Sequence, residues 1–203
     1  SLWAIPLVVR QGDRTDSVLL DGDQVRISLG DGAPVINAGG HGFYRVSYSD
    51  DLRMRLTSKF VATMSTLERY NLVDDAWNAV TAGNLDAIEF VALVERFGDE
   101  REYGVWQSIA IGLRGVRRLL PNDDAAVTGY QRRVVALVAP ALDAVGEPTQ
   151  GESELTAKLR GLLLSTLAVQ GGDTDACDWA RRCYDDWSND STSVDAELVA
   201  AAT

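Results

Sequence analysis

Histidine is the scarcest of the residues that commonly carry out chemistry, since only His41 occurs among the 203 residues of this chain. A single imidazole excludes the H-E-x-x-H motif, in which one helix presents two histidines to zinc. The two cysteines, Cys177 and Cys183, do not form the C-x-x-C pair of other common zinc sites. We therefore expect no catalytic residue, no metal ligand and no cofactor-binding residue in this chain.

The remaining candidates for chemistry favour structural roles. His41 lies in a glycine-rich turn, where we interpret it as a solvated or capping residue. A Ser-His-Asp triad that used it would lack the G-x-S-x-G motif. Asp74 and Asp75 form an acidic pair in a helical pattern, but adjacent helical residues point about 100° apart. The two carboxylates cannot face one reacting atom together, so we predict a structural role, such as pairing with Arg69.

Positive charge is scarce as well, because 19 basic residues stand against 30 acidic ones and the net charge is −11. Nucleic acids and anionic membrane surfaces require basic clusters, so we expect neither as a partner. No apolar run approaches the roughly 18 residues that cross a bilayer. The N-terminal segment lacks a basic leader and a cleavage site, and it begins as if cut from a longer chain.

The two cysteines lie in one predicted helix, and their spacing places them on different faces of it. We therefore interpret them as two reduced thiols. Such cysteine usage fits a cytoplasmic protein.

The apolar residues change their period near residue 50, which divides the chain into two predicted domains. Over residues 1–49 they alternate with period two, which predicts a small, incomplete antiparallel β-sandwich of about four or five strands. Pro6 favours an edge or a bulge for the first strand. A hairpin is expected around Asp21-Gly22-Asp23. The expected strand segments are residues 3–9, 18–20, 25–29, 35–36 and 43–48.

Over residues 50–203 apolar residues recur every three or four positions, which predicts an all-α domain and an α+β fold overall. The clearest helix spans Thr66 to Ala82, with Ser65 and Glu68 as a capping box and Gly83 as its stop. Its expected apolar stripe is Leu67, Tyr70, Val73, Trp77 and Val80.

Further helices are expected over residues 86–97, 103–120, 124–145, 155–169 and 174–187, and a last one begins near residue 193. In the helix over 103–120, Gly112 and Gly115 predict a close crossing with another helix. Pro140 is expected to kink or split the helix that contains it. The short connections predict stacked helical hairpins in a right-handed superhelical, HEAT-like arrangement, although no repeat of fixed period occurs.

Several segments resemble, in the same order, motifs of the aminopeptidase N family of zinc metallopeptidases. In that family an Asn, a glycine-rich turn and a G-[FY]-Y-R-V-x-Y strand join a β-sandwich to a C-terminal helical domain, and Asn37 to Tyr48 are similar. The other matching segments begin at Trp3 (W-A-I-P-L), Glu68 (E-R-Y-N-L-V-D-D-A-W), Glu102 (E-Y, with Trp106), Leu159 (L-R), Gly172 (G-D) and Ala180 (A-R-R-C-Y-D-D-W). Arg101-Glu102 departs from the family's acid spacing. The ordered set covers nearly the whole chain.

The resemblance implies a zinc aminopeptidase that hydrolyses N-terminal amino acids from peptides. Its catalytic domain would lie upstream in the same polypeptide and supply the zinc ligands, the glutamate base and recognition of the free α-amine. The present chain would be the end of the β-sandwich, over residues 1–49, and the first part of the helical domain, over 50–203, truncated at its C-terminus. No catalytic or metal-binding residue carries over, and the chain would enclose and support the active-site cleft.

One alternative remains open. A stand-alone helical scaffold could bind a protein or a peptide in a concave groove, as repeat proteins do. If the chain is a fragment, apolar surface at its ends would favour a dimer.

Overall fold

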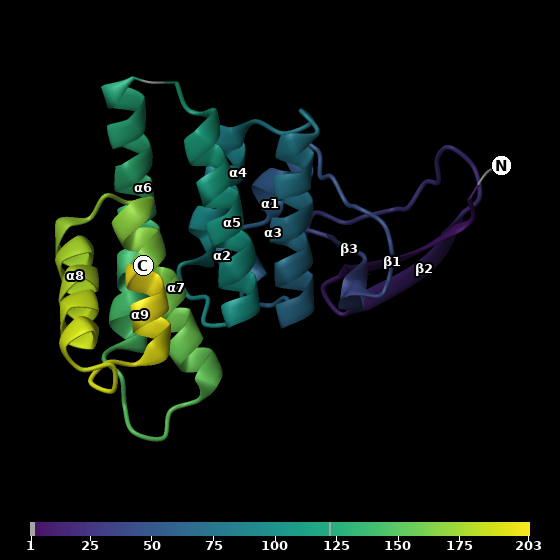
Figure 1. Cartoon of the computed structure of the whole chain (residues 1–203). Coiled ribbons are helices and arrows are strands. Elements are labelled where there is room, and N and C mark those ends of the chain that lie inside the picture. The colour runs from purple at the N-terminus through teal and green to yellow at the C-terminus, as the bar shows by residue number, and fades with distance from the viewer. Residues whose placement is uncertain (1–2, 122) are drawn as a thin grey trace. The chain divides into compact units, whose positions relative to one another are not determined.

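A small antiparallel sheet opens the computed structural model, which describes residues 3–121 and 123–203 (Figure 1). Strand β1 (Ile5–Gln11) lies between β2 (Arg14–Leu20) and β3 (Val35–Ile36). Although β1 is the central strand, β3 pairs only with Val9 and Arg10 of it. Pro6 therefore has a neighbouring strand on one side only, which suits a residue that lacks an N–H group.

Two strand predictions are wrong. The hairpin turn is Gly12-Asp13, because Gln11 pairs with Arg14 and Gly12 takes a φ of 56°. Residues 14–20 thus pair antiparallel with β1, the strand before them, and not with residues 25–29. Residues 25–29 belong to no strand. Residues 43–48 are not a strand either. The backbone N–H of Val46 donates to the side chain of Asp75 and not to a neighbouring strand. The described residues hold three strands, not four or five.

Helices begin at Asp50, as predicted, with α1 (Asp50–Arg55) and α2 (Ser58–Val61) leading to α3 (Thr66–Thr81). The predicted capping box of α3 is present, and Gly83 follows the helix with a positive φ. Its buried face agrees with the predicted stripe only in part, at Val73 and Val80. The buried side chains are Glu68, Leu72, Val73, Asp75, Ala76 and Val80, whereas Leu67 and Tyr70 are exposed.

The chain divides by packing into two units, Ser1–Leu85 and Asp86–Thr203. The 3-10 helix η1 (Ala38–Gly40) and α3 are in contact, which keeps the first helices with the sheet. An α+β fold is therefore confirmed. The domain boundary at residue 49/50 stays a prediction, and Ser1 and Leu2 of the first predicted domain lie outside the described residues.

The second unit, in its described residues, contains helices and no strand. They are α4 (Ala87–Val94), η2 (Glu95–Phe97), α5 (Tyr103–Leu119), α6 (Asp124–Val145), α7 (Glu154–Val169), α8 (Thr174–Asn189) and α9 (Ala196–Ala202). Helix α5 contributes Trp106, Ile109, Leu113 and Val116 to the core, and all four are buried. Helix α6 continues through Pro140 as one helix.

Gly112 marks a close helix crossing, as predicted. A Cβ at this position would lie 2.2 Å from the ring of Phe90, so α5 can approach α4 only because residue 112 has no side chain. The crossing fixes where α4 and α5 pack together.

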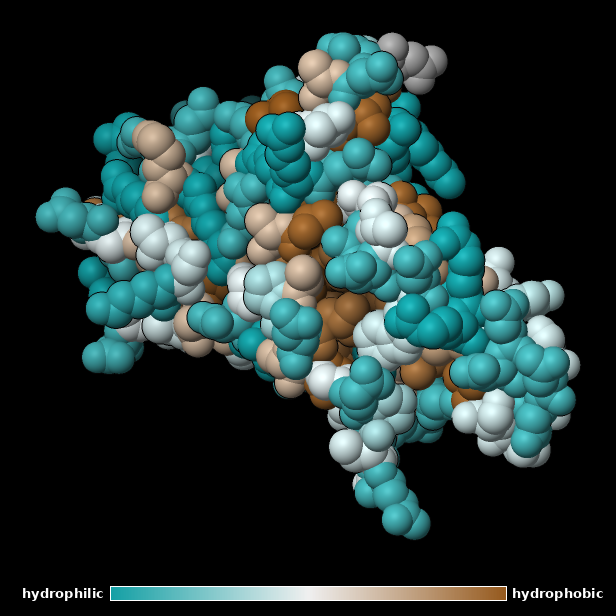
Figure 2. Space-filling model, turned by 90° about the vertical axis from the view of Figure 1, so that its left-hand side faces the viewer, coloured by the Kyte–Doolittle hydropathy of each residue, from teal (hydrophilic) through white to brown (hydrophobic). Residues whose placement is uncertain are grey.

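Helix α7 is the centre of the second unit, because it contacts α5, α6, α8 and α9. It therefore buries side chains on several faces, among them Leu159, Leu163 and Thr166. Leu155 and Val169, at its two ends, are 58% and 70% exposed. On the face that Figure 2 shows, apolar residues gather near the middle and hydrophilic residues lie around them. No helix in the described part of the chain has both the length and the apolar content needed to cross a membrane.

A buried arginine fixes the loop between α6 and α7. The side chain of Arg160 is 0% exposed, and its two terminal nitrogens donate to the two carboxylate oxygens of Glu152 over 2.7 and 2.6 Å. Its Nε donates to the carbonyl of Gly146 over 2.6 Å. Hydrogen bonding from Arg160 lowers the pKa of Glu152 below its ordinary value.

Replacing Arg160 by Lys should destabilise the chain. Lysine keeps the charge but cannot form the two-pronged contact with Glu152, so we expect the Tm to fall by roughly 10 °C in a circular dichroism melt. Arg181→Lys is the matched control, since Arg181 forms an exposed pair with Asp178 and should barely change the Tm. Equal Tm values for the two variants would contradict this assignment.

Candidate functional site

Where the sheet meets the first helices, hydrogen-bond donors from several segments contact the carboxylate of Glu68. Glu68 is the third residue of α3, and it is only 5% exposed. Its Oε2 accepts hydrogen bonds from the backbone N–H of Ser65 (2.9 Å) and from Arg10 (2.7 Å), and its Oε1 accepts from the N–H of Gly39 (3.0 Å). Three separate segments therefore meet at one side chain.

Hydrogen bonding decides the charge of this carboxylate. Burial alone would raise its pKa, but the donors of Gly39, Ser65 and Arg10 outweigh burial and lower the pKa of Glu68 below its ordinary value. Glu68 is thus held in its ionised form, with donors on both oxygens.

Asn37 holds the turn over residues 38–42, whose Gly39 contacts Glu68. This residue takes the left-handed conformation (φ 61°, ψ 44°), which asparagine tolerates better than most residues. Its side chain accepts from the N–H of Gly42 over 2.7 Å and donates to the carbonyl of the same residue over 3.0 Å. A Cβ on Gly40 would lie 2.6 Å from Leu67, so the turn packs closely onto α3.

The second carboxylate of α3 that contacts the junction is Asp75, which is 7% exposed. It accepts from Arg45 and from the N–H of Val46, each over 3.0 Å. Arg45 also pairs with Asp74. Where we predicted Arg69 as the partner of this acidic pair, the structure brings Arg45 to both acids, and Arg69 donates to the carbonyl of Met64. Burial raises the pKa of Asp75 despite the contacts with Arg45 and Val46.

Tyr48 ends the junction segment. Its hydroxyl accepts a hydrogen bond from the N–H of Ile36 over 3.0 Å, so a side chain satisfies the end of β3. Burial raises the pKa of Tyr48 to about 12. Residues 37–48, Glu68 and Asp75 together form what we call the junction cluster.

A cavity of about 380 Å³ lies beside the junction cluster. Its walls include Phe43, Tyr44, Arg45, Asn71 and Asp75. Arg45 and Asp75 are already paired with each other, so their contacts serve the fold and leave no acid-base pair directed at a ligand.

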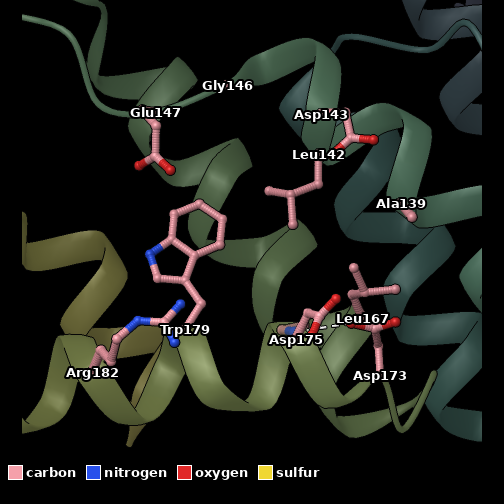
Figure 3. Close-up of a pocket in the computed structure, with 11 residues that line it drawn as sticks. Ala139, Leu142, Asp143, Gly146, Glu147, Leu167, Asp173, Asp175, Trp179 and Arg182 are labelled. Atoms are coloured by element: carbon pink, nitrogen blue, oxygen red, sulfur yellow. Dashed lines mark hydrogen bonds between the residues drawn. The ribbon is translucent and has the colours of Figure 1, made fainter.

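A larger cavity, of about 610 Å³, lies among α6, α7 and α8 (Figure 3). Trp179 projects from α8 towards the end of α6, and the carboxylate of Glu147 points towards its ring. Asp173, on the same wall, caps α8 by accepting from the N–H of Ala176 over 2.9 Å. Asp143 and Asp175 also line it, and Arg182 is the one cation among its lining residues, so the charges around the cavity are mostly acidic.

The other predicted candidates, His41, Cys177 and Cys183, are not among the residues that line these two cavities. His41 is exposed at the end of η1. Cys177 and Cys183 are free thiols, the latter buried. Across residues 3–121 and 123–203, no group of three or more His, Cys, Asp or Glu side chains could hold a metal ion. The described residues therefore do not fit a zinc site.

Sequence reasoning missed the partners of the two buried acids, Arg10 for Glu68 and Arg45 for Asp75. Arg10 reaches Glu68 across 58 residues of sequence, and Arg45 reaches Asp75 across 30. Neither pairing has a local signature, although the resemblance included Arg45 in its strand motif.

The chain is similar to a known family and to several longer proteins. A profile described as the ERAP1-like C-terminal domain matches residues 35–203. The chain is 27% identical over 204 residues to the tricorn protease-interacting factor F2 of Thermoplasma acidophilum, covering 98% of this chain and 24% of that protein. It is 30% identical over 150 residues to aminopeptidase M1 of Arabidopsis thaliana, covering 72% of this chain and 17% of that protein.

Glutamyl aminopeptidase of Homo sapiens is another relative, 26% identical over 207 residues, with 97% of this chain and 21% of that protein covered. The chain thus spans at most 24% of the length of these three relatives.

Replacing Glu68 by Gln should cost about 3 kcal/mol of unfolding free energy at pH 7, because it leaves buried donors facing a neutral amide. The folded pKa of Glu68 is lowered, so its contribution is present above its ordinary pKa and is lost as the pH falls through the folded value. The gap between wild type and variant should therefore close at low pH. Denaturant titrations at a series of pH values measure it.

Asp75→Asn is the matched control, because the folded pKa of Asp75 is raised. Its contribution is greatest at low pH and is lost as the pH rises, so this variant should cost less than Glu68→Gln at pH 7. A Glu68→Gln penalty that does not change with pH would refute the charged role of Glu68.

Proposed function

Because this chain belongs to the ERAP1-like C-terminal domain family, we propose that it is the non-catalytic C-terminal part of a zinc aminopeptidase. The relatives named above as aminopeptidases are several times longer than the matched region, so there is room in them for a separate catalytic domain. In the parent enzyme, that domain would lie upstream, hold the zinc ion and remove N-terminal residues from peptides.

The observation that supports this role is the junction cluster. Glu68 and Asp75, the two buried acids of α3, direct their oxygens to donors within the fold. A carboxylate with its oxygens engaged in this way holds segments together and is poorly placed to move protons for a substrate. In this proposal, Glu68 and Asp75, which belong to one of the segments that resemble the family, have structural roles.

The helical domain would enclose and support the active-site cleft of the parent, limiting substrate size and excluding water. We further propose that the sheet is the end of a β-sandwich and that the helices continue as a right-handed superhelical, HEAT-like array. A cytoplasmic location and a dimer of the isolated chain remain part of this proposal.

A stand-alone scaffold that binds a protein or peptide is the competing function. The coding region upstream of Ser1 separates the two. An H-E-x-x-H motif followed by a distant Glu supports the aminopeptidase, whereas an unrelated domain supports the scaffold.

The activity test uses aminoacyl chromogenic substrates with added zinc. The 203-residue chain should show no turnover above background, and the longer protein that contains it should show turnover that a chelator removes. His41→Ala should leave the activity of the longer protein unchanged. Turnover by the chain alone that disappears in His41→Ala would overturn the proposal.

A further inference from the structure

A cavity of about 320 Å³ lies between the C-terminal halves of α5 and α7 in the second unit. Three arginines of α5, Arg114, Arg117 and Arg118, line it. Their spacing of three and four residues brings them to one side of the helix. Helix α7 supplies Ser165, Thr166, Val169 and Gln170. The cavity is therefore positively charged in a chain whose net charge is −11.

The three arginines have no salt bridge or hydrogen bond to a protein side chain within the described ranges. Elsewhere in the same unit, Arg133 pairs with Glu95 and Arg160 with Glu152. Like charges three or four residues apart on a helix repel one another. The α5 C-terminus favours Arg117 and Arg118, but Arg114 lies a turn earlier and gains less. Among the residues that the structure describes, none supplies a salt bridge to these three arginines.

The wall that α7 forms is polar, and not all of its polar atoms have hydrogen-bond partners. Gln170 is 7% exposed, and its Oε1 has no hydrogen-bond partner among the described residues. Since no hydrogen bond fixes the carboxamide, it can turn its NH₂ group towards an acceptor. The hydroxyl of Thr166 donates to the carbonyl of Leu162 over 2.7 Å, whereas that of Ser165 reaches the same carbonyl only over 3.5 Å and can turn to donate to a ligand.

We propose that this cavity binds a phosphoryl group, either as inorganic phosphate or as the phosphate of a small monoester. A phosphoryl group carries a charge of about −1.5 to −2 at pH 7 and three acceptor oxygens. Each guanidinium presents a planar pair of donors that matches two of those oxygens. A single carboxylate has one charge and two oxygens, so it would satisfy fewer of the three arginines.

The size of the cavity agrees with a small ligand. Its 320 Å³ lies at the lower end of the range of about 300–1,000 Å³ for small-molecule sites. The space exceeds that of one phosphate ion, and the side chains of Ala110 and Val169 offer apolar wall to the organic part of a monoester. The site is independent of the proposed aminopeptidase role.

Isothermal titration calorimetry of the 203-residue chain tests the proposal, with sodium phosphate, phenyl phosphate and sodium acetate at constant ionic strength. Saturable binding of phosphate or phenyl phosphate is expected, and the tighter of the two identifies the source of the group. Acetate should bind at least about tenfold more weakly. Acetate that binds as tightly as phosphate, or a folded chain that binds neither phosphate nor phenyl phosphate, overturns the proposal.

Variants locate the binding. Arg114→Gln with Arg117→Gln should weaken phosphate at least about tenfold. The double variant Arg132→Gln with Arg181→Gln loses the same charge outside the cavity and should stay within about twofold of wild type. Equal weakening by both pairs means non-specific attraction and contradicts the site. Ser165→Ala, with an expected loss of about threefold, provides a second test if the arginine variant does not fold.

Discussion

The hydrogen bonds around the carboxylate of Glu68 are the constraint on which the first unit depends. They tie the start of α3, strand β1 and the turn at Gly39 to one buried charge. A buried carboxylate is tolerated only when donors replace the water it loses, and here they come from three segments. Asp75 is likewise a buried acid of α3, and it accepts hydrogen bonds from Arg45 and from the N–H of Val46. Helix α3 thus holds residues of the segment 37–48 in place through its two buried acids.

The sequence predicted what local chemistry determines. The capping box of Ser65 and Glu68 spans three residues, and the close crossing at Gly112 follows from a glycine within an apolar stripe, so both could be found. The partners of the buried acids could not be found, because Arg10 lies 58 residues from Glu68 and no periodicity links them. Alternating residues at 43–48 predicted a strand, yet Asp75, not a neighbouring strand, takes the N–H of Val46.

Buried faces were harder to predict than helices. Residues 68, 72, 75 and 76 share one face of α3, and two of them are acids, so a rule that places charges outside missed this face, although Val73 and Val80 of the predicted stripe are buried. Helix α7 has neighbours on several sides and no single stripe. The arginine-lined cavity joins residues of α5 and α7 that are far apart in sequence, and it follows only from the packed structure.

Amide hydrogen exchange at Gly39 and Val46 tests the central claim most directly. Both amides lie in segments outside regular strands and long helices, yet each donates to a buried carboxylate of α3. If the junction cluster exists in solution, these two amides will be protected nearly as well as the interior of α3. Exchange at the rate of exposed loop amides, while α3 stays protected, would show that the acids of α3 do not organise the junction.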